Sequence, residues 1–488
     1  MTLDPTAAPP DAGPARLVRP RQPRGRDALR RLCGGAVHLP GDPGYDGARR
    51  PWNLAVDQRP AAVAYPADAG EAAEVLRVAG RHGLRVAVQR TGHGAAALPP
   101  LDDVVVLRTA AMTAVRVDPG RRLARVGAGV LWEDVVAAAA PHGLVGLHGS
   151  SPDVGVVGYT LLGGLGWLAR SHGLACGSVT GAELVTGDGT SLWADAETEP
   201  ELLWALRGGG GGFGVVTALE FSLHELATAY AGWLAWDLRE AARVVPAWAE
   251  WAQAAPDEVT TALRLLRLPA SPEVPGPLRG RSLVVVDGAV TGPPERAGRS
   301  IAPLRALAPE TDTFASLPAA ALSRLHGDPG CPTAGLAEHR LLTSLPPAAV
   351  EAVLAVAGAG AGTSVVSVEL RQLGGALDRA GAGGGALTGL PGAYALVAVA
   401  APGDDPAGAR AALTALAAAL RPWSAPRRYA GFADASTPAA ACWDGPTLSR
   451  LRAVRAATDP AGQVVAAPDL DGAGDEPEHA ATSGAAVP

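Results

Sequence analysis

The chain has 488 residues, of which 48% are hydrophobic and 18% charged, and its formal net charge is −7. This length and composition predict two or three globular domains rather than a disordered segment. The negative charge argues against a nucleic-acid-binding protein, because phosphate recognition needs a basic surface.

The cysteines and the apolar runs exclude further classes. Cys33, Cys176, Cys331 and Cys442 lie far apart without C-x-x-C spacing, so neither a metal site nor a dense disulfide framework is predicted. The longest apolar run, 154–169, is too short and too glycine-rich to cross a membrane. No apolar segment follows the N-terminal arginines, so we expect no signal peptide, no membrane partner and a cytoplasmic location.

The first half of the chain mixes short strands and helices. Residues 1–35 are rich in Pro and Arg without periodicity, and we expect a flexible arm over 1–44. Hydrophobic periodicity and turn residues predict the elements that follow. Strands are expected over 63–66, 85–89 and 214–223, hairpins over 114–129 and 182–195, and helices over 68–84, 131–143 and 200–206.

The pattern changes near residue 226. Alternating strands and helices there predict a second, α+β domain over 227–425. Its strands are expected over 230–238, 260–268, 282–290, 364–373 and 394–402, and its helices over 240–253 and 407–423. A strand-like piece over 427–434, a helix over 448–465 and a disordered tail complete the chain.

A glycine run, RGGGGGFG, contains G-x-G-x-x-G at Gly209, Gly211 and Gly214. The dinucleotide fingerprint needs a strand before it and a helix after it. Here a predicted helix precedes the run and a predicted strand follows it, so a Rossmann site is excluded.

The stretch QRTGHG, residues 89–94, follows a predicted strand. Small residues leave backbone N–H groups unshielded, which suits a pyrophosphate. His93 lies between two glycines, so its ring is expected to be open to a ligand. The alternative is a surface histidine in a loop.

A second glycine-dotted stretch, 148–189, is apolar and almost free of charge. Its glycines permit close approach of the backbone to a flat ligand, among bulky apolar walls. The alternative is a tightly packed turn in the core.

The chain resembles the berberine bridge enzyme-like FAD-linked oxidases, which have a p-cresol methylhydroxylase-type FAD-binding domain. Nine segments match in the family's order over about residues 45–470. They include QRTGHG, VGAGVLWEDV, GSSPDVGVVGYTLLGGLGWLARSHGLA, ELVTGDG, VELRQLGGAL and RRYAGFAD.

The resemblance implies an α+β fold in two parts. The FAD-binding domain would comprise residues 45–226 and a C-terminal return, 426–475, followed by a disordered tail, 476–488. Residues 227–425 would form a substrate domain with an antiparallel sheet. The implied activity is FAD-dependent removal of a hydride from a small metabolite, alcohol or sugar, with O2 as the electron acceptor.

The resemblance also carries the cofactor site onto this sequence. The family's covalent flavin histidine falls on His93. The other implied FAD-binding residues are Gln89, Arg90, Thr91, Gly92, Gly94, Ser151, Val154, Gly155, Gly158, Tyr159, Gly164, Gly166, Leu174 and Val216. A second attachment through Cys, found in many relatives, falls on Ser151, so a single bond through His93 is expected. Valine at position 154 is typical of relatives that behave as oxidases.

The implied bases of the reaction fall on Tyr429 and Glu369. Alternate strand residues share a face, so Glu369 and Arg371 are expected to face the flavin together. The alternative is an ion pair between them on a solvated face of the sheet.

The sequence departs from the family pattern where three asparagines are usual. Gly212, Gly431 and Ala467 occupy these positions, and Leu162 replaces a usual glycine. A second hypothesis is therefore an FAD-binding protein of the same fold with lost redox activity. A hydrolase of unrelated fold is a third hypothesis, but the sequence has no G-x-S-x-G motif.

Overall fold

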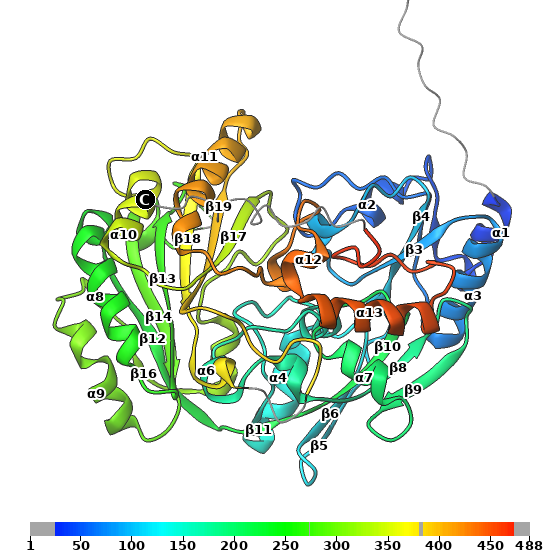
Figure 1. Cartoon of the computed structure of the whole chain (residues 1–488), viewed down its shortest axis with the longest axis horizontal. Coiled ribbons are helices and arrows are strands. Elements are labelled where there is room, and N and C mark those ends of the chain that lie inside the picture. Colours follow the sequence, from blue (N-terminus) through cyan, green and yellow to red (C-terminus); the bar gives the residue numbers. More distant parts are fainter. Residues whose placement is uncertain (1–24, 273, 380–383, 473–488) are drawn as a thin grey trace, which may run out of the picture.

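The structure, a computed structural model, describes residues 25–272, 274–379 and 384–472. It has two lobes: one contains small sheets, and the other is built on a large sheet with helices on its outer face (Figure 1). The mixture of helices with largely antiparallel sheets confirms the α+β fold class.

The elements of the first lobe come from both ends of the chain. Its strands are β1 (Val37–His38), β2 (Ala62–Ala64), β3 (Arg85–Gln89), β4 (Val104–Arg108), β5 (Val115–Asp118), β6 (Leu123–Gly127), β7 (Leu144–Val145), β8 (Val179–Val185), β9 (Ser191–Asp195), β10 (Val215–Ser222) and β11 (His224–Glu225). Its helices are α1 (Arg26–Arg30), α2 (Tyr45–Arg49), α3 (Ala69–Arg81), α4 (Trp132–Ala139), α5 (Val156–Leu161), α6 (Ala169–His172), α7 (Pro200–Leu206), α12 (Ala439–Cys442) and α13 (Gly445–Thr458).

The second lobe contains the remaining elements. Its strands are β12 (Thr228–Asp237), β13 (Val259–Arg267), β14 (Ser282–Val290), β15 (Thr311–Asp312), β16 (Ala315–Pro318), β17 (Leu336–Leu342), β18 (Val365–Gln372) and β19 (Tyr394–Ala400). Its helices are α8 (Ala241–Ala254), α9 (Pro294–Arg305), α10 (Pro347–Ala357) and α11 (Pro406–Ala419).

The first lobe contains two main sheets and a two-stranded sheet of β7 and β11. One main sheet has the order β1-β2-β4-β3, with β2 and β3 parallel to β4, and the other is antiparallel with the order β5-β6-β10-β8-β9. The predicted strand 85–89 is β3, and both predicted hairpins form. The Asp68 side chain caps α3 by accepting a hydrogen bond from the Glu71 backbone N–H. Helix α7 precedes the glycine run and strand β10 follows it, as the exclusion of a Rossmann site required.

The prediction of a flexible arm over 1–44 is wrong for residues 25–44, while residues 1–24 lie outside the described part. Strand β1 pairs with β2, and the side chains of Leu29, Leu32 and Leu39 are buried. These leucines lie in or beside elements of only two to five residues, too short to give a periodic pattern in the sequence or to be stable alone, and burial against α3 and the sheet orders them.

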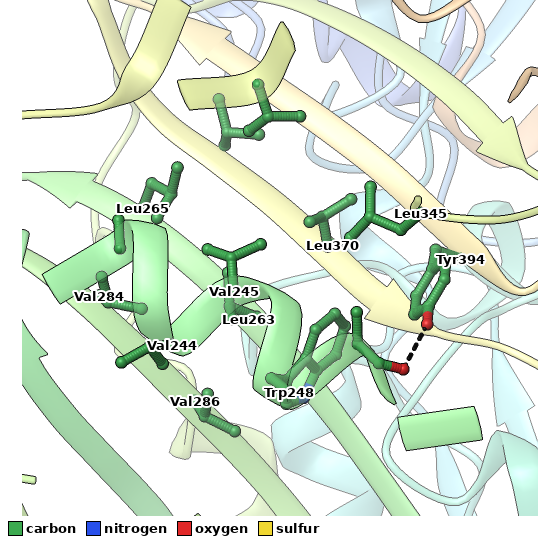
Figure 2. Packing of buried hydrophobic residues seen from close by; sticks show 14 of the residues in the cluster. Val244, Val245, Trp248, Leu263, Leu265, Val284, Val286, Leu345, Leu370 and Tyr394 are labelled. Atoms are coloured by element: carbon green, nitrogen blue, oxygen red, sulfur yellow. Dashed lines mark hydrogen bonds between the residues drawn. The ribbon is translucent and has the colours of Figure 1, made fainter. Parts of the chain in front are cut away.

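The second lobe is an antiparallel sheet of order β15-β12-β14-β13-β18-β19-β17, with β16 also paired to β12. Helices α8 to α11 cover its outer face (Figure 1). Figure 2 shows Val245 and Trp248 of α8 packed on Leu263 of β13, and the Tyr394 hydroxyl donates a 2.8 Å hydrogen bond to the Ala249 carbonyl. The opposite face of the sheet is therefore free to face the first lobe.

The chain returns to the first lobe after residue 425. Helix α13 packs on α7, and Val464 forms a parallel bridge to Val86 of β3. The strand predicted over 427–434 is wrong, because Ala430–Phe432 is a 3₁₀ turn. At this turn the Phe432 N–H bonds to the Tyr429 carbonyl instead of to another strand, and the buried Tyr429 side chain reaches back to the Gly164 backbone. The predicted tail, 476–488, lies outside the described residues.

Among the described helices, none is both long and apolar enough to cross a membrane.

Candidate active site

A cavity of about 2060 Å³ lies between the two lobes. Its wall includes the loop after β3, the start of α5, the inner face of the large sheet and the turn at 428–436. Ligand pockets usually measure about 300–1,000 Å³, so this cavity has room for a large cofactor together with a substrate.

The loop after β3 forms one wall. The residues predicted there, Gln89, Arg90, Thr91, Gly92, His93 and Gly94, all line the cavity. Gly92 has a φ of +85°, and a Cβ there would lie 2.8 Å from the Pro51 Cβ, so glycine is required for this turn. Both polar atoms of the buried Gln89 amide lack a hydrogen-bond partner, which leaves them available to a ligand.

His93 is held in a defined orientation at this wall. Its ring stacks on Trp52 with centroids 4.4 Å apart, and its Nδ1 lies 2.7 Å from the Thr91 hydroxyl oxygen. Its Nε2 lies 3.8 Å from the Asp153 carboxylate. Burial lowers the pKa of His93, although Asp153 acts against this shift, so the neutral and nucleophilic imidazole is favoured near neutral pH.

The segment from Ser151 to Tyr159 forms a second wall. Its predicted residues, Ser151, Val154, Gly155, Gly158 and Tyr159, all line the cavity, and so does Val216 of β10. The Ser151 hydroxyl donates a 2.9 Å hydrogen bond to the Asp153 carboxylate, which also accepts from the Trp52 indole. Ser151 thus orients the acid beside His93.

Three predicted cofactor residues, Gly164, Gly166 and Leu174, are not part of the wall. A Cβ on Gly166 would lie 1.9 Å from the His148 carbonyl oxygen, and Leu174 is buried in an apolar cluster. The Gly164 N–H donates to Tyr429. These residues pack behind the cavity wall, and their contact with the cofactor stays a prediction.

Tyr429 faces the cavity from the return segment. Its hydroxyl oxygen accepts a 2.8 Å hydrogen bond from the Gly164 N–H. Burial raises the pKa of the phenol, so Tyr429 is neutral and can donate its own proton in a hydrogen bond.

Glu369 faces the cavity from β18 and is paired with two cations. The Arg371 Nη2 lies 2.7 Å from one carboxylate oxygen, and the His326 Nε2 lies 3.3 Å from the other. Burial would raise the pKa of Glu369, but Arg371 and His326 outweigh burial and hold it well below its usual range. The pair with Arg371 does form, but it is buried at the cavity rather than solvated.

Three residues of this arrangement were missed from the sequence. The Asp287 carboxylate lies 2.8 Å from the His326 Nδ1 and 2.5 Å from the Arg264 Nη2. Burial and Arg264 act to lower the pKa of His326, but Asp287 and Glu369 raise it to about 9. We call Arg264, Asp287, His326, Glu369 and Arg371 the charged floor. The sequence does contain one sign of this charged cluster, which is the single Asp within the otherwise apolar strand SLVVVDGAV.

Several features of the wall fit FAD. The Tyr159 hydroxyl, like the Gln89 amide, is buried without a hydrogen-bond partner. At Gly94, Gly158 and Gly211 a Cβ would meet no protein atom within 4 Å, so the backbone is open to the cavity. These polar atoms and bare backbone suit a large flat group carrying phosphates. Within the described residues, no group of three or more His, Cys, Asp or Glu comes together as a metal site.

Comparison with known proteins agrees with this assignment. An FAD binding domain family matches residues 60–195. (R)-6-hydroxynicotine oxidase from Paenarthrobacter nicotinovorans is 37% identical over 203 residues, which is 41% of this chain and 44% of that protein. The chain thus spans less than half the length of this relative in the sequence match.

Structural similarity extends over most of the chain. The crystal structure of 6-hydroxy-D-nicotine oxidase from Arthrobacter nicotinovorans superposes with a TM-score of 0.74 and 27% identity, covering 88% of this chain and 95% of that one. Berberine bridge enzyme-like 1 from Physcomitrella patens superposes with a TM-score of 0.78 and 20% identity, covering 90% and 97%. In sequence and fold, the chain is therefore similar to the FAD-linked oxidases, including those of the berberine bridge enzyme-like type; it contains an FAD binding domain, and its cofactor is FAD.

Proposed function

We propose that this protein is an FAD-dependent oxidase that removes a hydride from a carbon of a small molecule and passes the electrons to O2. One observation carries the proposal. A single cavity joins the loop around His93 and the start of α5 to Tyr429 and Glu369, which come from two other segments.

Residues of the first lobe would hold the cofactor. The neutral His93 ring, fixed by Trp52 and Thr91, supports one covalent bond to the flavin. Ser151 has no thiol and its hydroxyl is engaged by Asp153, so it supports no second bond. The Gln89 amide and the backbone around Gly94 would contact the polar part of FAD.

The substrate would be held between Tyr429 and the charged floor. FAD, when bound, accepts the hydride. The ionised Glu369 carboxylate accepts a hydrogen bond from the substrate hydroxyl and then its proton, while the neutral Tyr429 phenol donates a hydrogen bond that orients the substrate. Because Arg371 and His326 weaken Glu369 as a base, loss of charge from His326 would strengthen it.

The experiment is anaerobic mixing of the purified holoprotein with a panel of alcohols, amines and sugars. Bleaching of the flavin absorbance by one substrate, followed by return of the colour and formation of peroxide in air, supports the proposal. A flavin that no panel member bleaches, although dithionite reduces it, favours the non-redox FAD-binding protein. Fast reoxidation only by an artificial acceptor identifies a dehydrogenase.

A further inference from the structure

The cavity face of the large sheet changes from charged to apolar along its strands. On β13, Arg264 is paired with Glu369 of β18. Two residues further along the same strand, Leu266 is paired with Leu283 of β14 and Ser367 of β18. Because alternate residues share a face, this second row lies beside the charged floor on the same side of the sheet.

Apolar side chains continue the second row outward. Six residues of this region pack together and line the cavity, and we call them the outer wall: Trp233, Leu266, Leu268, Leu278, Leu283 and Val285. They form a cluster separate from the core beneath α8 to α11. Four of them, Trp233, Leu266, Leu268 and Leu278, are only partly buried.

Five of the six outer-wall side chains have no group that could hydrogen-bond to a sugar; the exception is the indole of Trp233, and the nearest polar neighbour in the same row is Ser367. A hydroxyl that loses water without gaining a protein hydrogen bond costs about 1–3 kcal/mol. The side chains of Leu266, Leu283 and Val285 offer no donor or acceptor. A hydroxyl-rich ligand would therefore leave several groups unpartnered there, whereas an apolar ligand would cover the half-exposed leucines.

From this gradient we infer that the substrate is amphipathic: an oxidisable carbon bearing a hydroxyl lies at the charged floor, and an aromatic or aliphatic body lies on the outer wall. An oligosaccharide is not the substrate class. This inference rests on the proposed function for the reacting end, but the preference for an apolar body concerns binding alone.

The test uses two ligands that cannot lose a hydride and one hydroxyl-rich ligand. Phenol and 4-tert-butylphenol carry the same hydroxyl and have no hydrogen on the carbon that bears it, and cellobiose represents a hydroxyl-rich ligand. Binding to the holoprotein is measured by perturbation of the flavin absorbance and by equilibrium dialysis. Burial of each carbon strengthens binding by about fourfold, so partial burial of four carbons should give 4-tert-butylphenol at least about a tenfold lower Kd than phenol.

Two variants locate this preference. Leu266→Asn and the isosteric Val285→Thr place polar groups in the outer wall and should reduce the ratio of the two Kd values to below about threefold. Leu54→Asn is the matched control, because Leu54 is 43% exposed and does not line the cavity. It should keep the wild-type ratio. Flavin content and melting temperature are measured for each variant to exclude misfolding.

The outcomes separate this inference from the proposed function. Equal Kd values for the two phenols, or cellobiose binding more tightly than either, would overturn it even if the protein oxidises a substrate. An unchanged Kd ratio in both outer-wall variants with normal flavin content would also overturn it. If the wild-type protein binds 4-tert-butylphenol more tightly than phenol and both variants lose this difference, the inference is supported, even if no substrate bleaches the flavin.

Discussion

Tyr429 and Glu369 reach the cavity from different lobes, and each has a distinct environment. The Tyr429 hydroxyl is fixed by the Gly164 N–H, whereas Glu369 is fixed by two cations. Substitution of these side chains should therefore slow the reaction for different reasons.

Tyr429→Phe and Glu369→Gln should each slow anaerobic flavin reduction by about 10²–10⁴-fold, the usual contribution of a group that transfers or directs a proton. Flavin content should stay intact. Glu369→Gln should also lower the melting temperature, because it leaves the buried Arg371 without its anion and His326 with Asp287 alone. Stopped-flow reduction measures the rates, with Glu351→Gln on the exposed face of α10 as control. Rates within a factor of two of wild type in both variants would remove these residues from the mechanism.

Val154 tests the choice of electron acceptor. This half-buried side chain lines the cavity beside Gly155. The larger Val154→Leu side chain should obstruct oxygen and slow reoxidation of the reduced flavin in air by about tenfold, equivalent to about 1.4 kcal/mol in the barrier. Reaction with a one-electron artificial acceptor is the internal control. An unchanged rate of oxidation by O2 would show that this position does not control access.

At the scale of elements, the glycines around α5 have two different purposes. Gly158 lies in α5 on the cavity wall, where an added Cβ would meet no protein atom, whereas a Cβ on Gly166 would collide with the His148 carbonyl. One position would leave room for a cofactor, and the other permits packing.

Gly158→Ala should therefore keep or raise the melting temperature of the flavin-free protein, since alanine favours a helix by about 1 kcal/mol over glycine. It should lower the flavin content, because the methyl group enters the cavity. Gly166→Ala should instead destabilise the protein by about 1–3 kcal/mol through overpacking. Thermal unfolding and the ratio of flavin to protein check both outcomes. Full flavin content in Gly158→Ala would place the cofactor elsewhere.

Two of the three departures from the family's asparagines, Gly212 and Gly431, also have a local explanation. A Cβ on Gly212 would lie 2.6 Å from the Ala466 Cβ, and one on Gly431 would lie 2.6 Å from the Tyr429 ring. Neither position has room for asparagine in this packing. Glycine at these sites is therefore required by the neighbouring side chains of this chain.

The charged floor couples three strands to the loop that carries His326. Because its folded pKa of about 9 lies above the unfolded value of 6.5, His326 stabilises the fold while protonated. This contribution, up to about 3 kcal/mol, should be complete below about pH 6.5 and lost as the pH rises through 9. Denaturant unfolding of wild type and His326→Gln should show a difference in stability that shrinks over this range. A difference independent of pH would contradict the buried charge on His326.

At the scale of the whole molecule, local sequence patterns predicted most helices and strands but not the tertiary contacts between them. Strand β3 and the loop containing His93 were predictable because their residues are adjacent in sequence. Asp287, Arg264 and His326 were not, because their contact depends on the register of β13 against β14 and on a loop from elsewhere. The predicted strand at 427–434 is wrong because a local bond from the Phe432 N–H to the Tyr429 carbonyl closes a 3₁₀ turn there, while the Tyr429 side chain contacts Gly164, far away in the sequence.

The cavity itself belongs to neither lobe alone. The first lobe contributes the wall around His93 and α5, and the large sheet contributes the charged floor and the outer wall (Figure 1). The return of the chain to the first lobe after residue 425 brings Tyr429 to the same place. This arrangement supports the proposal that the first lobe binds the cofactor and that the large sheet binds the substrate.

Attachment of the flavin tests the central claim most directly. The purified protein is denatured in acid, and flavin absorbance is measured in the pellet and in the supernatant. We expect yellow colour in the wild-type pellet, where the ring of His93 is held against Trp52. His93→Ala lacks the imidazole that would bond the flavin, so its colour should appear in the supernatant. Colour released from the wild-type protein, or retained in the His93→Ala pellet, would contradict attachment of FAD through His93 alone.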